Sequence, residues 1–161
     1  MTTNNVTRFL DSKKVKYQAF DLPAEKLGAI ESARLLNVPA SQVFKTIIVL
    51  RTRPGKPILA IVPGDHEVDL KLLAEAAGEK KLQVSTQAEA EKLTGLQTGG
   101  ISPLALINRG FQMWLDSSAS GYDEIHISGG QRGLNIRLAV KDLLSLTGAR
   151  LAAISHAGSV E

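Results

Sequence analysis

Val43-Phe44-Lys45-Thr46-Ile47-Ile48-Val49-Leu50 is the strongest β-strand signal in the sequence, because β-branched and other apolar residues fill it almost without interruption. The connection Arg53-Pro54-Gly55-Lys56 is typical of a turn, and a second apolar run, Pro57-Ile58-Leu59-Ala60-Ile61-Val62, follows it directly. Two such runs joined by a short connection predict a β-hairpin at the centre of the fold.

Further elements extend from this hairpin in both directions. Periodicity predicts helices over 6–10, 30–36, 69–77 and 86–95 and a helix that ends at Thr147, with strands over 16–20, 82–84, 111–115, 124–127, 134–140 and 150–154. Asp69 is placed to cap a helix that Gly78 ends, and Thr86 to Glu89 fits a capping box. Beyond Ser155 we expect a frayed tail.

The order of these elements indicates the fold class. Strands in clusters with helices between them favour an α+β (mixed α/β) fold, in which helices surround a mixed, mostly antiparallel β-sheet or barrel. A doubly wound parallel sheet would need regular alternation of strands and helices, which is missing here. No stretch has the composition of a linker, so residues 1–161 are predicted to form a single domain.

Composition narrows the function classes. The chain has no cysteine, which excludes a disulfide framework, a thiolate metal site and a nucleophilic-cysteine enzyme. No apolar stretch approaches the roughly 18 residues of a membrane span, and the first residues lack a signal-peptide pattern, so we expect a cytoplasmic protein with no membrane contact. A formal charge of +3 permits an RNA partner without requiring one.

Lys45 is the first candidate for chemistry, because apolar residues surround it on both faces of its predicted strand. An ammonium group in such a place either extends to solvent, pairs with a carboxylate, or lies in a polar pocket where it meets an anion. The first two readings are structural and the third is functional, and the strand alone leaves all three open.

Two glycine-rich turns are the next candidates. Thr98-Gly99-Gly100-Ile101-Ser102-Pro103 could expose backbone N–H groups to a ligand, or be an ordinary tight loop, and Ser102 has no histidine base in view to activate it. Ser128-Gly129-Gly130-Gln131-Arg132-Gly133 lies between two predicted strands and is interpreted first as a hairpin turn, with Arg132 available to a phosphate.

The histidines do not form a metal-binding pattern, because His66, His126 and His156 are far apart and lack paired spacing. Asp65-His66-Glu67 is interpreted as a solvated lead-in to a helix. His126 alternates with the apolar Ile125 and Ile127, so its side chain is predicted to face solvent.

Taken together, Phe44-Lys45-Thr46 and the two glycine-rich turns resemble the YbaK family of Cys-tRNA(Pro)/Cys-tRNA(Cys) deacylases, which is related to the editing domain of bacterial prolyl-tRNA synthetases. The resemblance spans nearly the whole chain and implies a metal-independent aminoacyl-tRNA hydrolase without a cofactor. It implies catalytic roles for Lys45 and Gly100. It also implies substrate-binding roles for Phe20, Gly99, Ile101, Ser102, Pro103, Gly129, Gly130 and Asp142.

The resemblance also implies a mechanism and partners. The substrate is mischarged tRNA(Pro), and the thiol of a misattached cysteine attacks its own ester while Lys45 anchors the terminal ribose-phosphate and backbone N–H groups near Gly100 and Ile101 hold the carbonyl. A transient complex with prolyl-tRNA synthetase is expected. Deacylation of Ala-tRNA(Pro) or another small aminoacyl-tRNA, with water as the attacking group, and a non-catalytic module that binds tRNA or a synthetase remain the alternatives.

Overall fold

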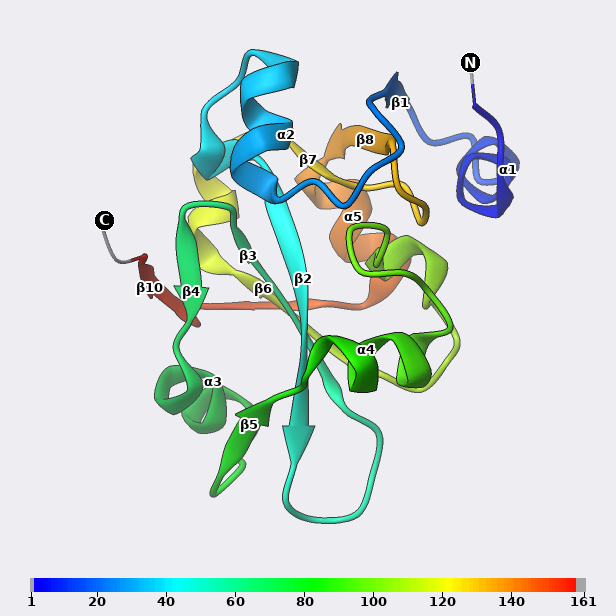
Figure 1. The fold of residues 1–161 in the computed structure, drawn as a ribbon. Coiled ribbons are helices and arrows are strands. Elements are labelled where there is room, and N and C mark those ends of the chain that lie inside the picture. The colour runs from blue at the N-terminus through cyan, green and yellow to red at the C-terminus, as the bar shows by residue number, and fades with distance from the viewer. Residues whose placement is uncertain (1, 159–161) are drawn as a thin grey trace.

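The computed structural model describes residues 2–158, and Figure 1 shows its arrangement. The helices are α1 (Asn5–Ser12), α2 (Ala29–Leu36), α3 (Leu70–Ala77), α4 (Gln87–Thr94) and α5 (Val140–Thr147), with short 3-10 turns η1 (Ala40–Gln42), η2 (Pro103–Ala105) and η3 (Ser117–Gly121). The strands are β1 (Tyr17–Asp21), β2 (Phe44–Arg51), β3 (Ile58–Pro63), β4 (His66–Val68), β5 (Leu82–Val84), β6 (Gln112–Asp116), β7 (Glu124–Ser128), β8 (Leu134–Ala139), β9 (Arg150–Ala152) and β10 (Ser155–Ala157). Every helix and strand predicted above is present.

The strands form three sheets, of which the largest has the order β5-β2-β3-β6-β9. The predicted hairpin is at its centre, with β2 antiparallel to β3 and Lys45 opposite Val62. Strands β3 and β6 are parallel, as are β6 and β9, whereas the β1-β8-β7 and β10-β4 sheets are antiparallel throughout. The predicted mixed, mostly antiparallel α+β fold is therefore confirmed, with separate sheets in place of one closed barrel.

Strand β3 is apolar along its whole length because both of its faces are covered. All six of its residues are buried. Ile58, Ala60 and Val62 pack into a core with Leu73 of α3, while Leu59 on the opposite face packs into a second core beneath α4. A strand covered on both sides needs no polar alternation, which is why the sequence signal here was a continuous apolar run.

The predicted helix ends also form. Asp69 Oδ1 accepts a hydrogen bond from Leu72 N at 3.0 Å, and Gly78 ends α3 in the left-handed conformation at φ +70°. Thr86 and Glu89 form the reciprocal capping box of α4, with N···O distances of 3.0 and 3.1 Å. These local signals were readable because cap and helix are neighbours in sequence.

The interpretations of Asp65-His66-Glu67 and of the tail beyond Ser155 were wrong. Strand β4 begins at His66 and pairs antiparallel with β10, so that Ser155 lies opposite Val68. Their side chains also meet, because His66 Nδ1 lies 2.8 Å from Ser155 Oγ. Each strand is three residues long and takes its partner from the far end of the chain, so no local pattern marks either one. Residues 159–161, also part of the predicted tail, lie outside the described residues.

Residues 2–158 lack two kinds of structural feature. None of the helices in this range is both long and apolar enough to cross a membrane. In the same range, no group of three or more His, Cys, Asp or Glu side chains is placed to hold a metal ion.

Candidate active site

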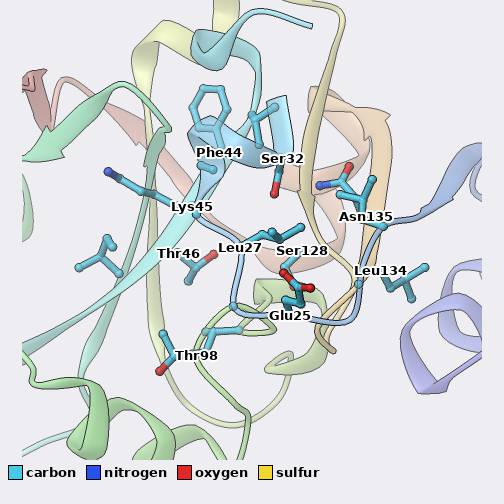
Figure 2. A pocket seen from close by; sticks show the side chains of 18 residues that line it. Glu25, Leu27, Ser32, Phe44, Lys45, Thr46, Thr98, Ser128, Leu134 and Asn135 are labelled. Atoms are coloured by element: carbon cyan, nitrogen blue, oxygen red, sulfur yellow. The ribbon is translucent and has the colours of Figure 1, made fainter. Parts of the chain in front are cut away.

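A pocket of about 220 Å³ opens where the start of β2 meets the two glycine-rich turns. Helix α2 and the segment before it form one wall, and the β7–β8 hairpin forms the other (Figure 2). The polar residues that line it are Glu25, Ser32, Lys45, Thr46, Thr98, Ser128 and Asn135, and the apolar ones include Leu22, Leu27, Phe44 and Ile101. Segments distant in sequence are therefore brought together around one cavity that has both apolar and polar side chains in its lining.

Lys45 lies on the β2 side of this pocket with weak partners for its charge. Its Nζ is 3.4 Å from the carbonyl oxygen of Gly64 and 3.9 Å from a carboxylate oxygen of Glu67. The side chain of Glu67 is 64% exposed, so water screens the ion pair strongly. Of the readings left open by the sequence, the structure shows a weak pairing with a carboxylate, and Lys45 also lines the pocket.

The two glycine-rich turns pack directly against each other at Gly100. A Cβ atom there would lie 2.8 Å from Gln131 Cα and 2.9 Å from Arg132 N, so only glycine lets the two backbones approach this closely. Arg132 Nε donates a hydrogen bond to Thr98 O at 2.8 Å and ties the turns together from the side. The predicted phosphate ligand Arg132 is thus engaged within the protein.

The expectation that Gly100 offers its N–H to the substrate was wrong. That group donates to Gln97 O at 2.8 Å and closes the turn. Gly99, at φ +93°, and Ile101 do line the pocket, as predicted from the sequence. The turn therefore provides shape through Gly100 and contact surface through its two neighbours.

Ser102 and Pro103 lie behind this surface. Ser102 is fully buried, and its Oγ accepts a hydrogen bond from Leu104 N at 3.2 Å, which caps the 3-10 turn η2. Pro103 occupies the first position of that turn, where its missing N–H costs nothing. Neither lines the pocket, so both support the turn from below.

Gly129 and Gly130 form the hairpin turn between β7 and β8, as the sequence predicted. A Cβ on Gly129 would lie 2.5 Å from Leu134 Cγ, and its carbonyl accepts a hydrogen bond from Asn4 Nδ2 at 2.9 Å. Gly130, at φ +95°, faces a separate hollow beside Val6 of α1. Both glycines shape the turn that carries Ser128 and do not line the pocket themselves.

The structure does not bring Phe20 and Asp142 into the pocket lining. The Phe20 ring packs against the His126 ring with centroids 5.5 Å apart, and Phe20 is the strand partner of the pocket residue Asn135 without lining the pocket itself. Asp142 lies on α5 in a different hollow, which also contains Lys13, Lys16 and Lys141. An acidic position near the last helix was the least constrained part of the sequence comparison, because no motif fixes its register.

His126 is buried, which contradicts the prediction that it faces solvent. Only 1% of the residue is exposed. The prediction assumed that the face of β7 that carries His126 is open to water, but the Phe20 ring packs 5.5 Å from the imidazole, centroid to centroid, and Asn135 Oδ1 lies 2.8 Å from His126 Nδ1. Alternation in sequence shows which residues share a face and cannot show what covers that face.

Comparison with known proteins identifies the family. Residues 24–146, more than half of the chain, match the family model described as the aminoacyl-tRNA editing domain. The chain belongs to this family. The family predicted from the motifs is thereby confirmed.

Two relatives of this chain differ in how much of their own length is similar to it. The protein EbsC of Enterococcus faecalis, named as a candidate Cys-tRNA(Pro)/Cys-tRNA(Cys) deacylase, is 34% identical over 153 residues, or 94% of this chain and 92% of EbsC. The proline–tRNA ligase of Geobacter metallireducens is 29% identical over 82 residues, or 51% of this chain and 14% of the ligase.

A solved structure is also similar. The crystal structure of a candidate trans-editing enzyme for prolyl-tRNA synthetase superposes with a TM-score of 0.79 at 26% identity, and the match covers 96% of this chain and 99% of that one. Both the fold and nearly the full length are therefore shared with a free-standing protein.

Several pocket residues of the editing domain escaped the sequence analysis, namely Glu25, Ser32, Thr46, Thr98, Ser128 and Asn135. Thr46, Thr98 and Ser128 belong to the quoted motifs and could have been chosen from their position beside Lys45 and the glycines. Glu25 and Ser32 come from the segment before α2 and from α2 itself, which carries no motif. Asn135 is a polar residue on a mostly apolar strand, and a polar side chain in that position could have indicated a pocket residue.

Proposed function

We propose that this editing domain removes the amino acid from mischarged tRNA(Pro), with Cys-tRNA(Pro) as its main substrate. The observation that carries the proposal is the pocket itself, which Lys45 lines together with Gly99 and Ile101 of the glycine-rich turn. The name of EbsC supports the substrate class, because EbsC is similar along nearly its whole length. A terminal adenosine that carries a small amino acid combines an anionic phosphate with a neutral ester, and the pocket lining combines the Lys45 cation with the Glu25 carboxylate and with neutral donors and acceptors.

The reaction is the cleavage of the ester between the amino acid and the ribose. In the thiol-assisted route, the cysteinyl sulfur bonds to the ester carbonyl carbon, its proton is lost, and the ribose oxygen leaves and takes up a proton. Water then opens the resulting thiolactone to free cysteine. The protein's contribution is to hold thiol and carbonyl together, which lowers the barrier without a protein nucleophile.

Lys45 anchors the phosphate of the terminal nucleotide in this scheme. Its screened pairing with Glu67 and its long contact to Gly64 O make its charge available for that contact. Because the exposed Glu67 carboxylate is only a weak partner, the tRNA phosphate is the strong anionic ligand of Lys45 in this scheme, and Lys45→Ala is expected to lower kcat/KM for Cys-tRNA(Pro) by roughly 100-fold. The measurement is release of labelled cysteine from Cys-tRNA(Pro), with circular dichroism as a check of folding.

Lys141→Ala is the matched control, because Lys141 is also a lysine but lines the hollow that contains Asp142. It is expected to deacylate at the wild-type rate. A Lys45→Ala protein that is folded and fully active would contradict the anchoring role. Lys45→Arg keeps the charge and separates its effect from that of side-chain shape.

The choice of amino acid is tested with a panel of substrates. Wild-type protein is incubated with Cys-tRNA(Pro), Ala-tRNA(Pro) and Cys-tRNA(Cys), and we expect the fastest release from Cys-tRNA(Pro). Faster release from Ala-tRNA(Pro) would instead favour water as the attacking group, because alanine has no thiol. Release from none of them, with tRNA still bound, would leave a non-catalytic tRNA-binding module.

A transient complex with prolyl-tRNA synthetase is part of this proposal. Proline–tRNA ligases carry a segment similar to half of this chain, so a free-standing domain would act on the same tRNA beside a synthetase. Adding prolyl-tRNA synthetase to the deacylation assay is expected to raise kcat/KM on Cys-tRNA(Pro). An unchanged rate, with no co-elution of the two proteins on a sizing column with tRNA, would contradict the complex.

A further inference from the structure

The back of the pocket wall contains a buried polar pair that the proposed chemistry has not used. His126 on β7 and Asn135 on β8 lie on the same face of the three-stranded sheet, and His126 Nδ1 is 2.8 Å from Asn135 Oδ1. His126 is 1% exposed and Asn135 is 5% exposed. Of the two, Asn135 lines the pocket and His126 does not.

The second ring nitrogen of His126, Nε2, indicates which of the two groups donates this hydrogen bond. Within residues 2–158, His126 Nε2 is buried and has no hydrogen-bond partner. If Nε2 carried the proton, a buried N–H would be left unpaired, which is rarer and more costly in proteins than an unpaired acceptor. The proton therefore belongs on Nδ1, which donates to Asn135 Oδ1.

The surroundings keep the imidazole in this neutral form. Burial lowers the pKa of His126 below its ordinary value, and the Arg137 guanidinium acts in the same direction, whereas the hydrogen bond to Asn135 and the Glu124 carboxylate act against it. Arg137 and Glu124 form an ion pair at 3.2 Å on the same face of the sheet. The Phe20 ring packs 5.5 Å away, centroid to centroid, as the apolar neighbour of the imidazole.

With Oδ1 occupied, the other end of the amide is directed into the pocket. Among the described residues Asn135 Nδ2 has no hydrogen-bond partner, although the side chain is almost fully buried. Figure 2 shows the Asn135 amide nitrogen pointing away from its strand, toward the side of the pocket where Ser32 lies. An amide held in this way offers two N–H groups to a ligand and no acceptor.

We propose that His126 is a positioning residue of the editing site, which fixes the Asn135 amide so that Nδ2 donates to an oxygen of the aminoacyl-adenosine end of the substrate. Asn135 is then a direct ligand and His126 acts through it. This inference rests on the proposed function for its substrate, but the orientation of the pair can be tested without turnover.

The first test is spectroscopic. Long-range proton–nitrogen NMR correlations of the wild-type imidazoles at neutral pH report which ring nitrogen of His126 is protonated. We expect Nδ1–H for His126, and we expect the Asn135 side-chain NH₂ signals to shift when an adenosine that carries alanine through an amide in place of the ester is added. An Nε2–H form, or NH₂ signals that do not respond to a bound analogue, would overturn the proposal.

The second test uses turnover of Cys-tRNA(Pro). His126→Phe keeps a ring but removes the donor, and is expected to lower kcat/KM about tenfold. His126→Asn places an amide N–H near the position of Nδ1 and is expected to restore activity to within about threefold of wild type. His156→Asn is the control, because His156 is exposed and pairs with Asp69 on the β10 side of the molecule.

The NMR and turnover experiments distinguish failure of the positioning role of His126 from failure of the proposed deacylase function. A folded His126→Phe protein with the wild-type rate overturns the positioning role. If His126→Phe does not fold, the ring-nitrogen assignment of the wild type still decides the question. Wild-type protein that deacylates none of the substrates contradicts the proposed function. The NMR result still decides whether His126 orients the Asn135 amide, because it does not depend on turnover.

Discussion

The missing side chain of Gly100 decides how closely the two glycine-rich turns approach. Its Cα faces the backbone of Gln131 and Arg132, which cannot move away as the end of a flexible side chain could. Ser102 and Pro103 then hold the turn from below, so that Gly99 and Ile101 line the pocket. The role of Gly100 is therefore steric, and its N–H is already used within the turn.

Gly100→Ala is expected to lower the free energy of unfolding by about 1–3 kcal/mol, because the added methyl group forces the turns apart. Deacylation should fall with it, since the pocket wall moves. Urea unfolding gives the stability. Gly121→Ala, where a Cβ meets nothing within 4 Å, is the control and should unfold at the wild-type midpoint. Equal urea midpoints for Gly100→Ala and Gly121→Ala would contradict the steric role of Gly100.

His126 predicts a pH dependence of stability. Because burial lowers its pKa in the folded protein, the unfolded chain binds a proton at about pH 6.5 that the folded chain does not yet bind. The free energy of unfolding is therefore expected to decrease as pH falls from about 6.5 toward the lower folded pKa, and to be unaffected by this group above that range. Urea titrations of wild type and His126→Asn should diverge in this interval. Parallel curves would show that His126 does not titrate differently on folding.

At the scale of elements, local and distant interactions contribute differently. Helix α4 begins with a capping box in which Thr86 and Glu89 satisfy each other's backbone N–H groups. Helix α4 covers the core beneath Leu59 through Ala90 and Leu93. Strands β4 and β10, in contrast, exist only as a pair formed between distant parts of the chain.

Thr86→Ala is expected to lower the free energy of unfolding by about 1 kcal/mol, because the N–H of Glu89 loses its acceptor at the helix start. The comparison is Thr52→Ala, an exposed threonine in the connection between β2 and β3, which should have no measurable effect. Thermal unfolding of both variants measures the difference. A Thr86→Ala protein as stable as Thr52→Ala would argue that the cap contributes nothing.

At the scale of the whole molecule, the pocket lies where separate parts of the fold meet. The long strand β2 crosses the centre of Figure 1, and helix α2 lies at its upper end beside β7. Lys45 comes from the five-stranded sheet, Asn135 and Ser128 from the three-stranded sheet, and Gly99 from the loop after α4. Lys45 also connects the five-stranded sheet to the β4–β10 pair, because its Nζ lies 3.9 Å from a carboxylate oxygen of Glu67 on β4.

A chain that ends at Ile154 retains the buried Ile154 side chain but loses β10. Amide exchange over 66–68 is expected to speed up, because β4 loses its strand partner. Exchange in β3, whose partners are β2 and β6, should stay slow. Hydrogen exchange followed by mass spectrometry measures both, and unchanged protection over 66–68 would contradict the role of β10.

The sequence by itself determined whatever is encoded by near neighbours and by composition. The β2–β3 hairpin, the capping box of Thr86 and the ends of α3 follow from residues only a few positions apart, and the α+β class follows from the order of such elements. The motifs around Lys45 and Gly100 were sufficient for the family. Lys45, Gly99 and Ile101, which the comparison of the motifs assigned to one site, line the same pocket.

Only the tertiary structure decided what covers each face and which distant groups meet. The burial of His126, its hydrogen bond to Asn135 and the pairing of β4 with β10 all depend on contacts between segments that the sequence separates. The same holds for Asp142, which α5 carries into another hollow. The physical reason is that periodicity fixes the direction of a side chain relative to its own strand or helix, whereas its surroundings are fixed by packing between elements.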